Sequence, residues 1–243
     1  MTKPVIVGDD DNAQEPVEPK NQLEIYAYFQ TPVYLVEKPE YLDTVRSIMT
    51  EEIDEIKKTR KLHPLYPLYQ TNNLTGDPRI KEFANYVGAT AWNILDSQGY
   101  AMDKFTVFFQ EMWGQEHHKH SAHEEHVHGG GCQLVGFYFL DTPEDCSRLV
   151  VHDPRPAKRI VNLPEKTMSN VTLGSTAINF LPKPGSLYFL PSWVPHSFGR
   201  HGNKKPLRFI HFTVGVGNQA ATIDVDTGLP PDTKNPVPPA EVI

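Results

Sequence analysis

Six of the eleven histidines in the chain lie within the twelve residues His117–His128. This stretch leads into an apolar segment that is typical of a β-strand. Residues i and i+2 of an extended chain lie on the same face, so His126 and His128 can bind one metal ion, and so can His123 and Glu125. Neutral imidazole suits first-row transition metals, and a carboxylate adds charge. The spacing therefore predicts a metal site and leaves both pairs of ligands open.

A further candidate ligand lies far downstream, in the segment 183–198 with the sequence KPGSLYFLPSWVPHSF. A tight turn at Pro184–Gly185 precedes a short strand. Pro191 and Pro195 then fix a bend in the backbone, because the proline ring restricts φ. This bend presents His196, which we expect to join the histidines of the first cluster at the metal.

Arg208 follows in the apolar segment 207–214, LRFIHFTV. The planar guanidinium group forms paired hydrogen bonds with carboxylates, so an arginine in such a strand favours a bound planar anion. The alternative is an arginine at the edge of the core, paired with an Asp or Glu of the chain itself.

The elements that must position these residues change in character along the chain. Apolar residues recur at helical spacing in 41–61 and 77–96, which predicts two amphipathic helices, the second capped by Asp77. Two short strands broken near Thr31–Pro32 are predicted within Leu23–Glu37. Short β-branched and aromatic segments separated by turns then follow: 105–109, 134–140, 149–152, 177–181, 186–190 and 207–214. Helices followed by a run of short strands indicate an α+β fold with an antiparallel jelly roll.

Composition limits the organisation and the function classes. Residues 1–21 are acidic and unpatterned, which predicts a disordered segment. Residues 22–217 form one predicted domain. The prolines of 218–243 predict an extended tail. The net charge of −7 disfavours a nucleic-acid binder, and no apolar run approaches the 18 residues of a membrane span. Two cysteines exclude a disulfide scaffold. We expect a cytoplasmic protein with no membrane partner.

Four ordered motifs together resemble the 2-oxoglutarate/Fe(II)-dependent oxygenase superfamily. They are HVHGGGCQLVGFYFL (126–140), LVVHDPRP (149–156), PKPGSLYFLPSWVPHSF (182–198) and LRFIHFTV (207–214). The resemblance is to the branch with an H-x-H motif and a distal F/L-P-S-x-x-x-H motif. It implies a double-stranded β-helix, or jelly roll, with N-terminal helices packed on the major sheet and iron between the two sheets.

The resemblance also implies roles for individual residues. His126 is the first iron ligand, His196 is the distal ligand, and Arg208 binds the distal carboxylate of 2-oxoglutarate. The superfamily has Asp or Glu two residues after the first histidine, where this chain has His128. Either His126, His128 and His196 form a three-histidine site, which we favour, or His123 and a carboxylate are the facial pair.

In the second arrangement the carboxylate is Glu125, and His126 and His128 lie behind it or line the pocket. The superfamily often has a hydroxyl two residues after the strand arginine, where this chain has Ile210. Tyr138 and Ser197 are therefore candidates to complete the carboxylate site.

The implied activity is an oxygenase that couples decarboxylation of 2-oxoglutarate to succinate with O₂-dependent hydroxylation of a small-molecule or peptide substrate. One alternative is a cupin-like three-histidine dioxygenase that does not use 2-oxoglutarate, and another is a metal-binding β-sandwich without catalysis. Jelly-roll oxygenases often pair through helices or edge strands, so a homodimer is a further expectation.

Overall fold

The computed structural model describes residues 24, 26–161 and 163–218. The predicted acidic segment 1–21 lies outside the described residues, as does the predicted tail apart from residue 218. The chain divides into two compact units, Met1–Gln30 and Thr31–Ile243. Of the two strands predicted within Leu23–Glu37, only β1 (Tyr34–Glu37) is present among the described residues.

The two predicted amphipathic helices are confirmed as α1 (Leu42–Thr59) and α2 (Lys81–Ser97). Asp77 does act as a cap, but of the 3₁₀ turn η2 (Pro78–Ile80) that precedes α2, where its carboxylate accepts a 2.8 Å hydrogen bond from the backbone N–H of Arg79. The remaining helical segments are short: η1 (Pro39–Tyr41), η3 (Met102–Lys104) and α3 (Pro156–Ile160). In the described part of the chain no helix is both long and apolar enough to cross a membrane.

The described residues contain ten strands, which form two antiparallel sheets. The major sheet has the order β1-β8-β5-β10-β3-β2, and the minor sheet has the order β4-β9-β6-β7. The strands of the major sheet after β1 are β2 (Leu68–Gln70), β3 (Phe105–His117), β5 (Cys132–Asp141), β8 (Ser186–Pro191) and β10 (Leu207–Asn218). Those of the minor sheet are β4 (His123–His126), β6 (Leu149–His152), β7 (Ala177–Phe180) and β9 (His196–Phe198). All six predicted segments after residue 100 are strands, and β2, β4 and β9 are additional.

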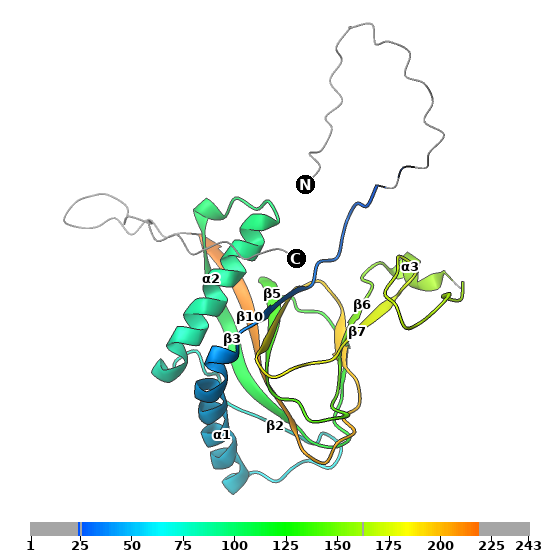
Figure 1. Ribbon diagram of the computed structural model, residues 1–243. Helices are drawn as coiled ribbons and strands as arrows, with labels where there is room; N and C mark the ends of the chain where they lie inside the picture. Colours follow the sequence, from blue (N-terminus) through cyan, green and yellow to red (C-terminus); the bar gives the residue numbers. More distant parts are fainter. Residues whose placement is uncertain (1–23, 25, 162, 219–243) are drawn as a thin grey trace, which may run out of the picture. The chain divides into compact units, whose positions relative to one another are not determined.

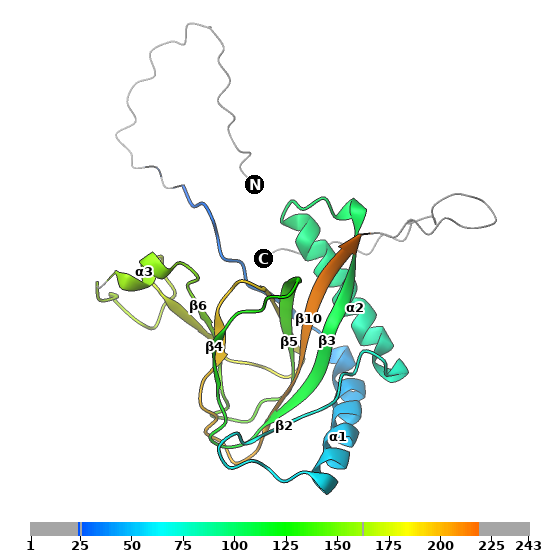
Figure 2. The same ribbon diagram turned by 180° about the vertical axis from the view of Figure 1, so that it is seen from behind.

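The predicted α+β jelly roll is therefore confirmed, and its three layers enclose two cores. Both α1 and α2 lie on one face of the major sheet, and the minor sheet lies on the other (Figures 1 and 2). The outer core, between the helices and the major sheet, includes Phe83 and Phe212. The inner core, between the two sheets, includes Phe137, Phe198 and Phe209.

Close packing in the major sheet requires a glycine at one central position. A Cβ atom added at Gly136 would lie 2.1 Å from the ring of Phe212 and 2.7 Å from the carbonyl oxygen of Tyr188. Because a backbone oxygen cannot move aside as a flexible side chain can, only glycine fits there.

The alternation of side chains in β10 decides which residues reach the space between the sheets. Ile210 and Phe212 pack in the outer core, whereas Phe209 packs in the inner core. Because successive side chains of a strand point to opposite faces, Arg208 lies with Ile210 on the helix side and His211 lies with Phe209 on the inner side.

Candidate metal centre

Three histidines come together at the edge of the minor sheet. His126 ends β4 and is paired with His196, which begins β9. The backbone N–H of His128 donates to the carbonyl of Ser192 at 3.0 Å, which holds the residue beside them. One side-chain nitrogen from each of the three histidines lies within 4.8 Å of the others. Imidazoles at this spacing could hold a single metal ion.

The ring hydrogen bonds of His126 and His196 leave one nitrogen of each free for a metal. Nδ1 of His196 lies 3.0 Å from the carbonyl oxygen of Val194, and Nδ1 of His126 lies 2.8 Å from that of Glu124. A carbonyl oxygen only accepts, so each Nδ1 carries the proton and each Nε2 offers a lone pair. Nε2 of His196 and Nε2 of His128 are buried without a hydrogen-bond partner. The three rings therefore fit a first-row transition metal, with two of the imidazole ligands oriented by backbone carbonyls.

Burial keeps the rings of His196 and His128 neutral. Desolvation is the main cause that lowers the pKa of His196 to about 3 and that of His128 to about 4, and the neighbouring imidazoles add to both shifts. A neutral ring is the form that binds a metal, so His196 and His128 need no deprotonation near neutral pH to act as ligands.

The alternative pair of ligands, His123 and Glu125, is not brought together at the centre. Glu125 accepts two hydrogen bonds from Arg159, at 2.6 and 2.8 Å, and the bonding to Arg159 lowers the pKa of its carboxyl. The register of β4 shifts between His123 and His126, so the rings of these two residues lie on the same side, 5.9 Å apart, although they are three residues apart. This irregularity breaks the simple i, i+2 pairing on which the alternative depended.

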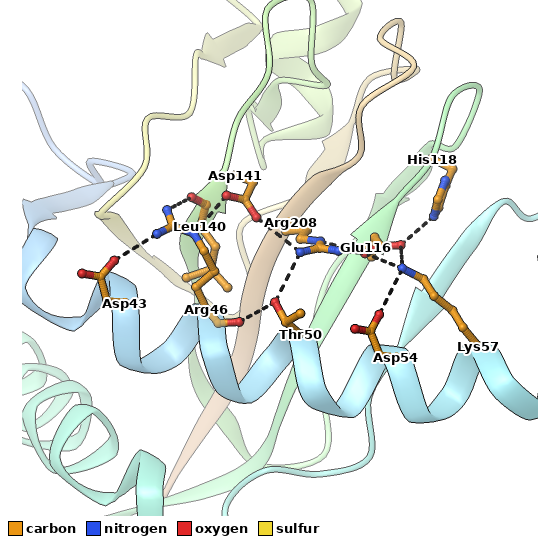
Figure 3. A network of polar contacts seen from close by, with 10 residues as sticks. All are labelled: Asp43, Arg46, Thr50, Asp54, Lys57, Glu116, His118, Leu140, Asp141 and Arg208. Atoms are coloured by element: carbon orange, nitrogen blue, oxygen red, sulfur yellow. Dashed lines mark hydrogen bonds and ion pairs between the residues drawn. The ribbon is translucent and has the colours of Figure 1, made fainter.

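Arg208, predicted to bind the cosubstrate, is placed on the far side of the major sheet from the histidines. Its Nε donates to Glu116 at 2.7 Å, and its guanidinium group also lies 3.7 Å from Asp141 and 3.4 Å from the hydroxyl of Thr50 in α1. Figure 3 shows this network between α1 and the sheet. The guanidinium binds a carboxylate of the chain itself, as in the alternative interpretation, and its role as the cosubstrate anchor is corrected here.

Glu116 is the centre of that network and is fully buried. Burial alone would raise the pKa of its carboxyl, but hydrogen bonds from His118 and Lys57 and the charge of Arg208 hold it down at about 2. The carboxylate is therefore charged and paired on the helix side of the sheet (Figure 3).

Tyr138 and Ser197 also point away from the histidines, which corrects their predicted role at a carboxylate site. The phenol of Tyr138 donates to the carbonyl of Lys38 at 2.6 Å, in the outer core. The hydroxyl of Ser197 lies 2.9 Å from Nε2 of His152. Tyr138 follows the inward-facing Phe137 in β5, and Ser197 follows the inward-facing His196 in β9. Successive side chains of a strand point to opposite faces, so both residues face away from the space between the sheets.

The structure adds one residue that the sequence analysis did not select, His211. Its ring is buried and lies 5.3 Å from that of His128, and the ring of Trp113 lies 5.0 Å from it on the adjacent strand. Burial lowers its pKa well below the usual value. Nε1 of Trp113 is buried and has no hydrogen-bond partner among the described residues. The available signal was a histidine inside an otherwise apolar strand, three residues after Arg208.

A comparison with family models gives a match over residues 111–210, to the family described as "Putative 2OG-Fe(II) oxygenase". The middle of the chain therefore resembles this oxygenase family. The matched segment holds all three histidines of the centre, and the family resemblance stated from the motifs is confirmed. No curated protein sequence matches the chain.

Solved structures of the same fold are similar over most of the chain. The epimerase SnoN from nogalamycin biosynthesis, described as non-heme and α-ketoglutarate-dependent, is 12% identical, with a TM-score of 0.52 over 89% of this chain and 92% of its own. A prolyl-4-hydroxylase from Pseudomonas putida is 11% identical, with a TM-score of 0.50 over 75% and 92%. A viral collagen prolyl hydroxylase from Paramecium Bursaria Chlorella virus-1 is 13% identical, with a TM-score of 0.50 over 75% and 94%. At these identities the likeness establishes the double-stranded β-helix fold.

Proposed function

We propose that this protein is an Fe(II)/2-oxoglutarate-dependent oxygenase whose iron is held by His126, His128 and His196. The observation that carries the proposal is the convergence of three imidazoles within the segment that matches the oxygenase family. When bound, iron and 2-oxoglutarate would supply the oxidative chemistry, in which decarboxylation to succinate accompanies oxygenation of the substrate, by hydroxylation in our proposal.

The chain's own residues position and shield the metal. The carbonyls of Val194 and Glu124 fix the ring orientations of His196 and His126. The ring of Phe137 packs 5.5 Å from that of His196 and helps to exclude water from that side. Three protein ligands on one side of an ion leave positions for a chelating cosubstrate and O₂.

The distal carboxylate of the cosubstrate needs hydrogen-bond donors other than Arg208. Apart from that residue, β3, β5 and β10 contain no lysine or arginine. We therefore assign the carboxylate to the neutral donors of the inner face, the indole N–H of Trp113 and the imidazole of His211. The unpartnered indole nitrogen supports this assignment, since a buried donor without an acceptor is costly.

The test is an anaerobic titration with Fe(II), with and without 2-oxoglutarate, followed by visible absorption. We expect a weak charge-transfer band that requires both components. His196→Ala removes a ligand and should abolish iron binding and the band. Ser197→Ala is the matched control, because its hydroxyl faces away from the histidines, and should retain both.

Each other outcome would change the proposal. Stoichiometric iron without the band would favour a three-histidine dioxygenase that does not use 2-oxoglutarate. Full iron occupancy in His196→Ala would contradict the ligand set. Trp113→Phe should weaken 2-oxoglutarate binding without changing the iron stoichiometry, and an unchanged affinity would contradict the neutral carboxylate site.

A further inference from the structure

A cavity of about 270 Å³ opens beside His128, at the end of the inner face of the major sheet. Its walls come from β3, from β10, from the first residue of β5 and from the loop between β4 and β5. They are formed by Gln110, Glu111, His128, Gly129, Gly130, Cys132 and Thr213. Glu111 and Thr213 are directly paired across β3 and β10, so their side chains lie on the same face as His211.

The glycine loop that closes one side of the cavity is tied to the sheet. The side-chain amide of Gln110 donates to the carbonyl of Gly130 at 2.8 Å. Gly130 and Gly131 have φ values of 62° and 85°, which glycine adopts without strain. The wall of the cavity is thus defined by a turn that the sequence GGG makes possible.

One charged side chain lines this cavity, the carboxylate of Glu111. The lining contains no lysine or arginine. Within the described part of the chain, the carboxylate of Glu111 has neither an ion pair nor a hydrogen bond, whereas Glu116 and Glu125 are both held by arginines. Burial raises the pKa of the Cys132 thiol to about 11, and the charge of Glu111, which lines the same cavity, adds to this shift.

We propose that this cavity receives a cationic nitrogen group of the substrate, an ammonium or a guanidinium, with Glu111 as its counter-ion. The inference rests on the proposed function, since it places the substrate beside the metal ligand His128. A volume of about 270 Å³ is below the range of about 300–1,000 Å³ that holds a whole drug-sized ligand, so the cavity admits one end of a substrate. An acidic group would meet an unpaired carboxylate there without a compensating cation.

The first test uses three small probes of equal length: n-butylammonium, 1-butanol and butyrate. Binding to the metal-free protein is measured by ligand-observed NMR. We expect n-butylammonium to bind most tightly, and Glu111→Gln to weaken it about fivefold, as expected for one exposed charge pair. Glu82→Gln, at an exposed position in the first turn of α2, is the matched control and should change nothing.

A charge reversal keeps the test decisive. Glu111→Lys should bind butyrate more tightly than n-butylammonium, and thermal unfolding checks that both variants at this exposed position remain folded. Equal binding of the three probes, or no effect of either substitution at residue 111, would overturn the inference.

A second measurement separates this inference from the proposed function. Co(II) added to the protein should broaden the NMR signals of bound n-butylammonium, because the cavity adjoins His128. Probe binding that depends on Glu111 without stoichiometric Co(II) binding would overturn the metal centre and the placement of substrate beside it. Stoichiometric Co(II) binding without probe binding would leave the metal centre intact and overturn the cavity assignment.

Discussion

Replacing Arg208 with alanine tests whether this residue stabilises the fold or binds the cosubstrate. The substitution leaves Glu116 fully buried with two remaining partners, Lys57 at 2.9 Å and His118 at 2.7 Å. Removing one member of a buried ion pair costs about 3–5 kcal/mol when the other charge is left uncompensated. Since two partners remain here, we expect Arg208→Ala to lower the free energy of unfolding by about 2 kcal/mol.

The pKa of Glu116 gives an independent measure of the same network. Its shift from 4.5 to about 2 corresponds to about 3 kcal/mol for all the partners together, of which Arg208 supplies a part. A lowered carboxyl pKa stabilises the folded state above the unfolded value of 4.5. This contribution is lost as the pH falls from about 4.5 towards 2, so the difference between wild type and Arg208→Ala should shrink over that range.

Urea unfolding followed by circular dichroism measures both effects. Arg148→Ala is the control, because its exposed side chain forms no ion pair among the described residues, and it should unfold as the wild type does. A double-mutant cycle with Glu116→Gln isolates the pair. If Arg208→Ala unfolds like wild type but loses the absorption band that depends on 2-oxoglutarate, Arg208 is the cosubstrate anchor and the structural reasoning is refuted.

Three further predictions concern the core, the pH dependence and the ligand set. Gly136→Ala should lower the free energy of unfolding by about 1–3 kcal/mol in urea, because its Cβ would meet a backbone oxygen, whereas Gly76→Ala, with open space around it, should not. Burial lowers the pKa of His117 to about 3. Below a pH of about 6.5 the unfolded chain therefore binds a proton at this residue that the folded protein does not bind. The free energy of unfolding decreases as the pH is lowered from about 6.5 to about 3. His117→Gln should reduce that slope by up to about 1.4 kcal/mol per pH unit, measured by urea unfolding at a series of pH values. Glu125→Gln breaks the pair with Arg159 and should leave the metal stoichiometry unchanged in a titration, while loss of the metal would restore Glu125 as a ligand.

The two helices could be predicted from their helical period, and most strands could be predicted from short β-branched and aromatic segments between turns. The apolar positions of α1, such as Val45, Ile48 and Ile53, recur at helical spacing and are buried against the sheet. By contrast β4 and β9 are short and contain no β-branched residue, so they lack the composition that indicated the other strands. Their existence depends on pairing with each other, which is a tertiary contact between distant segments.

The orientation of β10 could not be predicted because both of its faces are buried. Ile210 and Phe212 on one side and Phe209 on the other are all apolar, so the usual alternation of apolar and polar residues is absent. A shift of one residue exchanges the two faces of a strand. The sequence therefore did not show that Arg208 faces the helices while His211 faces the space between the sheets.

The arginines of the chain help to explain why the centre is built from imidazoles. Glu116 ends up on the helix side, held by Arg208, and Glu125 is held by Arg159 on the outside of the minor sheet. Each of these carboxylates lies next to the histidine cluster in sequence, and each is already neutralised by a guanidinium group. A divalent ion bound to three neutral rings would keep its full charge, which favours a chelating anion such as 2-oxoglutarate in the remaining positions. The same field would repel a substrate cation, so the unpaired carboxylate of Glu111 supplies the compensating charge that a cationic group needs in order to bind beside the metal.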